Sequence, residues 1–193
     1  MRVPSSDIER RKRRRRRRIQ IIVIYTAIAV GLAWFFESQA TTTVIFVRHA
    51  EKAATPADDP GLSQAGQRRV AELTRQLVDA DVVAGVDAVY STPYRRTEET
   101  ARPVADALSL PINSYDAADT EAIMEHIVKV HKGKVILVVG HSNTVPALIG
   151  NMGASKRVPE IAEDEYDNIY IVSIPWFGKT KTIRLRYGEP YAP

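Results

Sequence analysis

From residue 43 onward, short apolar runs alternate with amphipathic stretches. The apolar runs are rich in β-branched residues and predict buried strands at 43–48, 87–91, 111–115 and 134–139. The stretches between them predict helices over 63–80, from Pro93 onward, over 119–131 and from about residue 142. Two later alternating runs, 168–174 and 179–187, predict a hairpin at a sheet edge. This order predicts an α/β domain with a mostly parallel central sheet flanked by helices.

Helical spacing also predicts which residues of these helices face the core. In the 119–131 helix, Ile123, Ile127 and Val130 lie on one side. In the helix that begins near Pro93, Pro103 is expected to disturb or kink the helix, because proline lacks the backbone N–H that an interior turn needs.

An uncharged run of eighteen residues, 19–36, precedes the domain. At about 1.5 Å per residue, a helix of this length just crosses a bilayer core of roughly 30 Å. Residues 1–18 carry ten Lys or Arg residues, and Glu37 follows the run. This asymmetry predicts a transmembrane signal anchor with its N-terminus in the cytoplasm and the domain outside, in the periplasm or at the cell surface. The predicted organisation is a basic cytoplasmic segment 1–18, a span 19–36, a linker 37–42 and a domain 43–193.

Two other interpretations of the N-terminal part remain open. Ser38-Gln39-Ala40 offers small residues where a signal peptidase cleaves, so that cleavage near Ala40 would release the domain. A basic arm that binds nucleic acid is disfavoured by the adjoining apolar run.

Outside residues 1–18 the charge balance reverses. The remaining 17 basic and 21 acidic residues give this part a net charge of −4, which does not favour a nucleic-acid surface. The chain contains no cysteine, which excludes disulfides, zinc–thiolate sites and a cysteine nucleophile.

Two of the predicted strands end at a histidine. The first is followed by Arg48-His49-Ala50-Glu51, and the fourth by Gly140-His141. In open α/β sheets, chemistry is placed just beyond the carboxyl ends of the strands. We therefore expect the two histidines to act together.

Four segments together resemble the motifs of the histidine phosphatase superfamily, which contains phosphoglycerate mutases and acid phosphatases. They occur in the family's order and are Arg48-His49-Ala50-Glu51, the segment Leu62 to Arg69, the segment Ser91 to Ala101 and Gly140-His141. The resemblance implies a three-layer, phosphoglycerate mutase-like domain.

The resemblance also implies the roles of four residues. His49 is expected to be the nucleophile that forms a phosphohistidine, and His141 the second catalytic histidine, which also binds phosphate. Arg48 and Arg96 are expected to bind the phosphoryl oxygens, since a guanidinium fork fits two oxygens at once. These side chains supply the positive charge, so that no metal ion or cofactor is expected. Arg95 is expected to be solvated or ion-paired.

A general acid is needed to protonate the leaving-group oxygen. The family often supplies a carboxylate from the segment between the second arginine and the second histidine. Asp116 is our candidate, because it follows the third strand most closely. Asp119, Glu121 and Glu51 are the competitors, and some small phosphohistidine phosphatases lack a dedicated acid.

Departures from the family's motifs favour a hydrolase. Ala54 and Thr55 stand where mutases carry tryptophan and asparagine, and Ser142 stands where they commonly carry glycine. The expected activity is hydrolysis of a phosphomonoester or phosphohistidine in a small molecule or a phosphoprotein. The alternatives are a phosphoglycerate mutase-type phosphotransferase and a non-catalytic, membrane-tethered module that binds phosphorylated ligands. The polar, acidic stretch 151–167 is expected to be a solvated connection rather than a lid.

Overall fold

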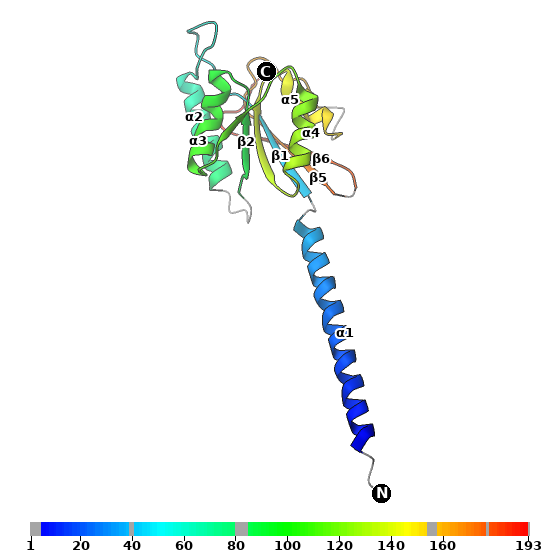
Figure 1. Cartoon of the computed structure of the whole chain (residues 1–193). Helices are drawn as coiled ribbons and strands as arrows, with labels where there is room; N and C mark the ends of the chain where they lie inside the picture. The colour runs from blue at the N-terminus through cyan, green and yellow to red at the C-terminus, as the bar shows by residue number, and fades with distance from the viewer. Residues whose placement is uncertain (1–4, 39–40, 80–84, 154–157, 177, 193) are drawn as a thin grey trace. The chain divides into compact units, whose positions relative to one another are not determined.

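The computed structural model describes residues 5–38, 41–79, 85–153, 158–176 and 178–192 (Figure 1). The chain divides into two compact units, Met1–Gln39 and Ala40–Pro193. The predicted cleavage position near Ala40 lies outside the described residues.

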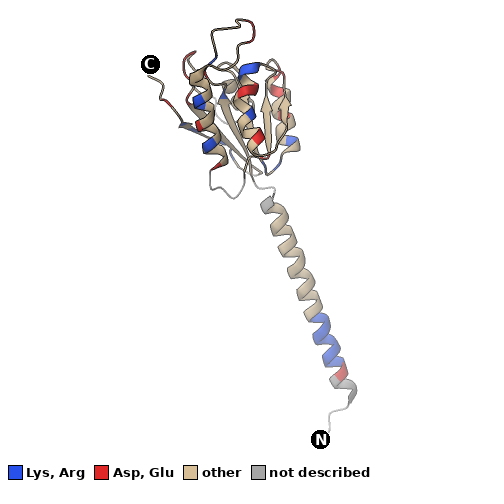
Figure 2. Cartoon of the chain, turned by 90° about the vertical axis from the view of Figure 1, so that its left-hand side faces the viewer, with Lys and Arg blue, Asp and Glu red and all other residues tan. Residues whose placement is uncertain are grey.

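The first unit is one long helix, α1 (Ser5–Ser38). Its basic residues gather in the N-terminal part, and the rest of the helix is free of Lys and Arg (Figure 2). The stretch Glu9–Phe36 is long and apolar enough to cross a membrane. Its most apolar part is not buried within the protein. Length and composition of this kind are also typical of a signal sequence near an N-terminus.

A six-stranded sheet forms the centre of the second unit, in the order β3-β2-β4-β1-β5-β6. The strands are β1 (Thr41–Arg48), β2 (Ala88–Ser91), β3 (Ile112–Ser114), β4 (Val135–Gly140), β5 (Asn168–Pro175) and β6 (Lys181–Arg186). The pairs β1–β4, β2–β4 and β2–β3 are parallel, whereas β5 pairs antiparallel with β1 and β6. The predicted parallel sheet with a hairpin at one edge is confirmed.

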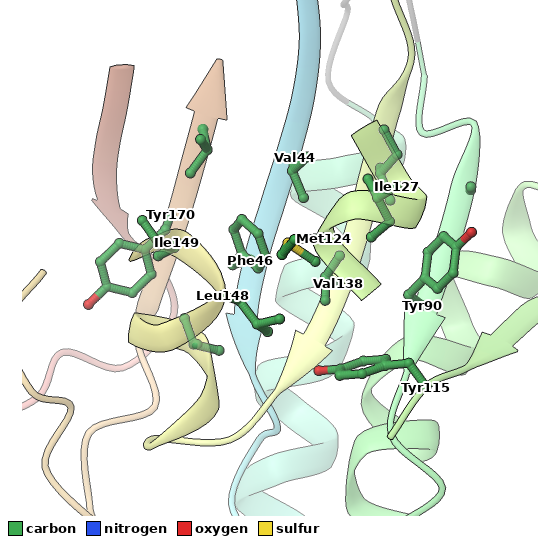
Figure 3. Packing of buried hydrophobic residues seen from close by; sticks show 14 of the residues in the cluster. Val44, Phe46, Tyr90, Tyr115, Met124, Ile127, Val138, Leu148, Ile149 and Tyr170 are labelled. Carbon is green, nitrogen blue, oxygen red and sulfur yellow. The ribbon is translucent and has the colours of Figure 1, made fainter. Parts of the chain in front are cut away.

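Four helices cover the two faces of this sheet (Figure 1). They are α2 (Gln64–Val78), α3 (Arg95–Ala107), α4 (Thr120–Val130) and α5 (Thr144–Asn151). Successive residues of β1 point to opposite faces, because a strand alternates its side chains. Val44 and Phe46 pack with residues of α4 and α5 (Figure 3), and Ile45 and Val47 pack with residues of α2 and α3. The unit is therefore a three-layer α/β domain, as predicted.

The helix α4 differs in detail from the pattern expected of it, and α3 contains its proline at an interior position. In α4 the prediction for Val130 was wrong: it is 57% exposed, and Met124 faces the core instead, since the true apolar stripe includes Met124 and Ile127. In α3, Pro103 does not end the helix, which continues to Ala107. The lost hydrogen bond is compensated because Val104 and Ala105, directly after the proline, are buried in the core.

Candidate active site

Parallel pairing of β1 with β4 brings two distant histidines together. Arg48 pairs with Gly140 in the register, so that the next residues, His49 and His141, emerge at the same sheet edge. The backbone N–H of His49 donates to the Gly140 carbonyl at 2.9 Å. The two imidazole ring centres lie 5.4 Å apart, and both residues are more than nine-tenths buried.

The ring of His49 is held in one tautomer. Its Nδ1 lies 2.8 Å from the carbonyl oxygen of Ala50, and a carbonyl oxygen only accepts, so that Nδ1 carries the proton. Burial lowers the pKa of His49 to about 3, with smaller contributions from the charges of Arg48, His141 and Arg96. At neutral pH the ring is therefore uncharged, and its Nε2 keeps a free lone pair.

The ring of His141 is held by Thr92. Nε2 of His141 lies 3.0 Å from the hydroxyl of Thr92. Thr92 directly follows β2 and is completely buried. Burial, and then the charges of Arg96 and Arg48, lower the pKa of His141 to about 4. Both histidines are thus neutral at pH 7, and the fixed positive charge comes from the arginines.

Arg96 lies in the first turn of α3, beside the histidines. Its guanidinium carbon lies 4.6 Å from the ring centre of Tyr94, and the Tyr94 ring in turn meets the His141 ring edge-on at 5.3 Å. Its ion pair with Asp59 is a long one, at 3.9 Å. The neighbouring Arg95 is ion-paired with Glu99 at 3.2 Å on the exposed side of the helix, as expected.

Arg48 is bound mainly to the protein itself. One terminal nitrogen donates to the carbonyls of Ala162 at 2.6 Å and Glu165 at 3.0 Å, and the other to the carbonyl of Glu163 at 2.6 Å. Its guanidinium carbon lies 4.2 Å from the ring centre of Tyr166. Its Nε is buried and has no hydrogen-bond partner among the residues that the structure describes. For an anion, therefore, the donors that remain are Nε–H and the second hydrogen of one terminal nitrogen.

One cavity of about 690 Å³ joins these groups. The candidate residues that line it are Arg48, His49, Arg96, Asp116 and His141. Ser142, Asn143 and Thr144, at the start of α5, also line it. The first backbone N–H groups of a helix are free to bind an anion, so this position suits a phosphate. No group of three or more metal-ligating side chains occurs among the described residues.

The four candidate acids have different surroundings. Asp116 lines the cavity and accepts a hydrogen bond from the backbone N–H of Ala118 at 2.9 Å. Asp119 caps the start of α4, and Glu121 lies in the first turn of that helix. Glu51 forms an ion pair of 2.8 Å with Arg69 and does not line the cavity. Geometry therefore favours Asp116.

Sequence reasoning missed several residues of the cavity wall, among them Lys52, Tyr94, Glu163, Asp164 and Tyr166. Tyr94 had a signal, since it lies in the segment Ser91 to Ala101 that resembles a family motif, where the family has leucine. Glu163, Asp164 and Tyr166 lie in the stretch expected to be a solvated connection. In fact its described residues 161–167 pack against the domain, with Ile161, Glu165 and Asp167 buried, so the expectation was wrong there.

A family model supports the resemblance seen in the sequence. Residues 44–119 match the model of the histidine phosphatase superfamily (branch 1). No curated protein sequence matches the chain.

Solved structures share the fold of the domain. The protein histidine phosphatase SixA, solved with tungstate, is 20% identical with a TM-score of 0.60, over 75% of this chain and 96% of that one. A mycobacterial glucosyl-3-phosphoglycerate phosphatase is 11% identical with a TM-score of 0.54, over 69% of this chain and 90% of that one. A phosphoglycerate mutase from Plasmodium falciparum is 16% identical with a TM-score of 0.55, over 80% and 97%. At these identities the likeness concerns the fold.

Proposed function

The chain belongs to the histidine phosphatase superfamily, and we propose that it hydrolyses phosphomonoesters or phosphohistidine through a covalent intermediate on His49. The family supports phosphatase or phosphotransferase chemistry. The observation that carries the finer proposal is the neutral ring of His49, with its Nε2 lone pair free, in one cavity with His141 and Arg96.

In the first step, Nε2 of His49 attacks phosphorus, and the bond from phosphorus to the leaving-group oxygen breaks. The ring becomes positively charged, and its Nδ1–H···O bond to Ala50 stabilises that charge. Arg96, His141 and Nε of Arg48 stabilise the charge on the phosphoryl oxygens. Asp116, in its protonated form, gives its proton to the leaving-group oxygen.

In the second step, water attacks the phosphohistidine. Asp116, now a carboxylate, takes a proton from that water, and the nitrogen–phosphorus bond breaks to release phosphate and regenerate neutral His49. None of these steps needs a metal ion, because the arginines and His141 supply the stabilisation.

The test is hydrolysis of p-nitrophenyl phosphate by the full chain in a non-ionic detergent. His49→Ala is expected to lower kcat/KM by about 1,000-fold or more, since it removes the nucleophile. The matched control is His126→Ala, which changes an exposed histidine on α4 outside the cavity and is expected to leave kcat/KM unchanged.

Trapping the intermediate separates this function from its alternatives. A ³²P-labelled substrate is expected to give an acid-labile, base-stable phosphoprotein that His49→Ala does not form. Equal rates for the native chain and His49→Ala would refute the nucleophile. Transfer of the phosphoryl group to a second phosphate ester instead of water would identify a mutase, and binding without turnover a non-catalytic module.

The proposal places the domain outside the cytoplasm, held by residues 19–36. The apolar run of α1, with its basic residues all on the N-terminal side, supports this orientation. Retention of the chain in carbonate-washed membranes, with the domain open to protease from the outside, is the expected result. A reporter fused after Pro193 that is active only in the cytoplasm would refute the orientation, and a mature mass beginning after Ala40 would refute the anchor.

A further inference from the structure

The cavity at the site is lined by charges of both signs. Arg48, Arg96 and Lys52 line it together with the two histidines. The carboxylates of Glu163 and Asp164, both exposed, line the same space. A ligand that fills the cavity therefore meets both positive and negative side chains.

The two carboxylates are carried on a fixed turn. The carbonyls of Ala162 and Glu163 accept hydrogen bonds of 2.6 Å from Arg48. The buried Glu165 side chain accepts from the Ala162 N–H at 3.2 Å and pairs with Arg186 at 3.1 Å. These bonds use the backbone of the turn, so that the side chain of Glu163 is not consumed in holding it.

Asp164 lies near Tyr191, since desolvation of the Tyr191 hydroxyl, and then the charges of Asp164 and Glu165, raise the pKa of Tyr191. The turn that carries the two carboxylates is positioned before any ligand arrives, which lowers the entropy cost of using it for recognition.

An independent observation favours Arg48 as the place for the anionic end of a ligand. Arg48 is 6% exposed, lines the cavity and has a buried Nε–H without a partner in the described part of the chain. A buried donor left without an acceptor is unfavourable, and an anionic oxygen would satisfy it. Burial lowers the pKa of Arg48, while the charges of Glu163 and Asp164 act in the opposite direction, which reflects how near they lie. The anion site and the carboxylates are therefore close neighbours.

We propose that Glu163 and Asp164 select phosphomonoesters whose leaving group carries a positive charge, such as an ammonium group, a few ångströms from the phosphate. This deepens the proposed function, because that function assigns the phosphate to the arginines and histidines. A leaving group with a second anion, such as the carboxylate of a phosphoglycerate or a further phosphate, is repelled by the same two side chains.

Three small ligands of nearly equal size test this selection. Phosphoethanolamine, ethyl phosphate and phosphoglycolate carry a positive, a neutral and a negative group beside the phosphate. Their Kd values are measured by calorimetry on the full chain carrying His49→Ala, which prevents turnover. We expect phosphoethanolamine to bind at least tenfold more tightly than phosphoglycolate, at about threefold to tenfold per carboxylate.

The variant that isolates the effect is Glu163→Gln with Asp164→Asn, which keeps the shape and the backbone carbonyls of the turn. It is expected to bring the affinities for the three ligands to within about twofold to threefold of one another. The matched control is Glu160→Gln, an exposed carboxylate outside the cavity lining, which is expected to keep the native ranking. Raised salt is expected to reduce the differences in Kd between the three ligands when the two carboxylates are present, because these carboxylates are solvated.

The outcomes separate this inference from the proposed function. Equal Kd values for the three ligands, an unchanged ranking in the double variant, or no binding of any of them would overturn the inference. If the ligands rank as expected but the native chain hydrolyses no phosphomonoester, the selectivity stands and the proposed function is wrong. If the native chain hydrolyses phosphomonoesters but binds the three ligands alike, the proposed function stands and the selectivity is wrong.

Discussion

The two sides of the cavity are built in different ways. The strand-end side, with His49, Arg96 and His141, is fixed by the register of parallel strands and the first turn of α3. The turn side, residues 161–167, is fixed by side chains instead, through Arg48 from within the cavity and Arg186 from β6. Sheet register is rigid, because slipping it would break a whole ladder of hydrogen bonds and unpack both faces. The difference fits the proposed division, with chemistry on the strand-end side and selection on the turn side.

Among the variants that compare the two sides, the largest effect is expected from Arg96. Arg96→Ala removes the cation that we propose stabilises the transferring phosphoryl group, and we expect kcat/KM to fall by about 100-fold to 1,000-fold. Arg95→Ala, one position earlier but on the exposed face of α3, is the matched control and is expected to stay within about twofold. Similar losses for the two variants would show that the effect belongs to the helix rather than to the strand-end side of the cavity.

Arg186 tests how the turn side is held. Arg186→Ala removes the ion pairs to Asp167 at 2.6 Å and Glu165 at 3.1 Å and leaves Asp167 buried without that cation. We expect the free energy of unfolding to fall by about 2–3 kcal/mol, with KM rising more than kcat falls. Urea unfolding and steady-state kinetics measure both, with exposed Lys181→Ala on β6 as the control.

If Arg186→Ala lowered kcat as much as Arg96→Ala does, the division between the two sides of the cavity would be contradicted. In that case the turn would take part in the chemical step.

Asp116 gives a smaller effect that depends on the substrate. Asp116→Asn is expected to lower kcat/KM about 10-fold to 100-fold for an alkyl phosphate, whose leaving group needs a proton. For p-nitrophenyl phosphate, whose leaving group departs without one, the loss is expected to be less than about threefold. If Glu51→Gln lowered kcat/KM for the alkyl phosphate by this amount and Asp116→Asn did not lower it, the general acid would be Glu51.

The last effect concerns the stability of the strand-end side at low pH. His49 and His141 have folded-state pKa values lowered to about 3 and about 4, below the ordinary 6.5, because both are buried. The unfolded chain then binds more protons, so that stability is fully present above about pH 6.5 and is lost as the pH falls toward these values. Each histidine contributes at most about 1.4 kcal/mol per pH unit in that range.

The measurement is urea unfolding of the full chain at several pH values between 4 and 7.5. His49→Gln is expected to show a shallower dependence of the unfolding free energy on pH than the native chain, and exposed His126→Gln the native dependence. Equal slopes for all three chains would show that the histidines are not buried in their neutral forms.

Much of the fold was predictable because its signals are local. Ser63 precedes an amphipathic stretch, and it caps α2 by accepting from the Gly66 N–H. The strands stand out as apolar runs because β1 and β4 are buried on both faces. Val130 was misplaced because two apolar stripes compete on α4, and only the position of the sheet decides which one is covered.

For the candidate site, the sequence by itself determined which residue types end each strand and in what order they occur, which was enough to pair His49 with His141. Only the tertiary structure decided what those residues touch. In the folded domain the terminal nitrogens of Arg48 donate to the carbonyls of Ala162, Glu163 and Glu165, and Glu163 and Asp164 line the same cavity as the arginines. These contacts join segments far apart in the chain, and no local pattern encodes them, because they arise only when the sheet brings β1 beside β5 and the turn that precedes it.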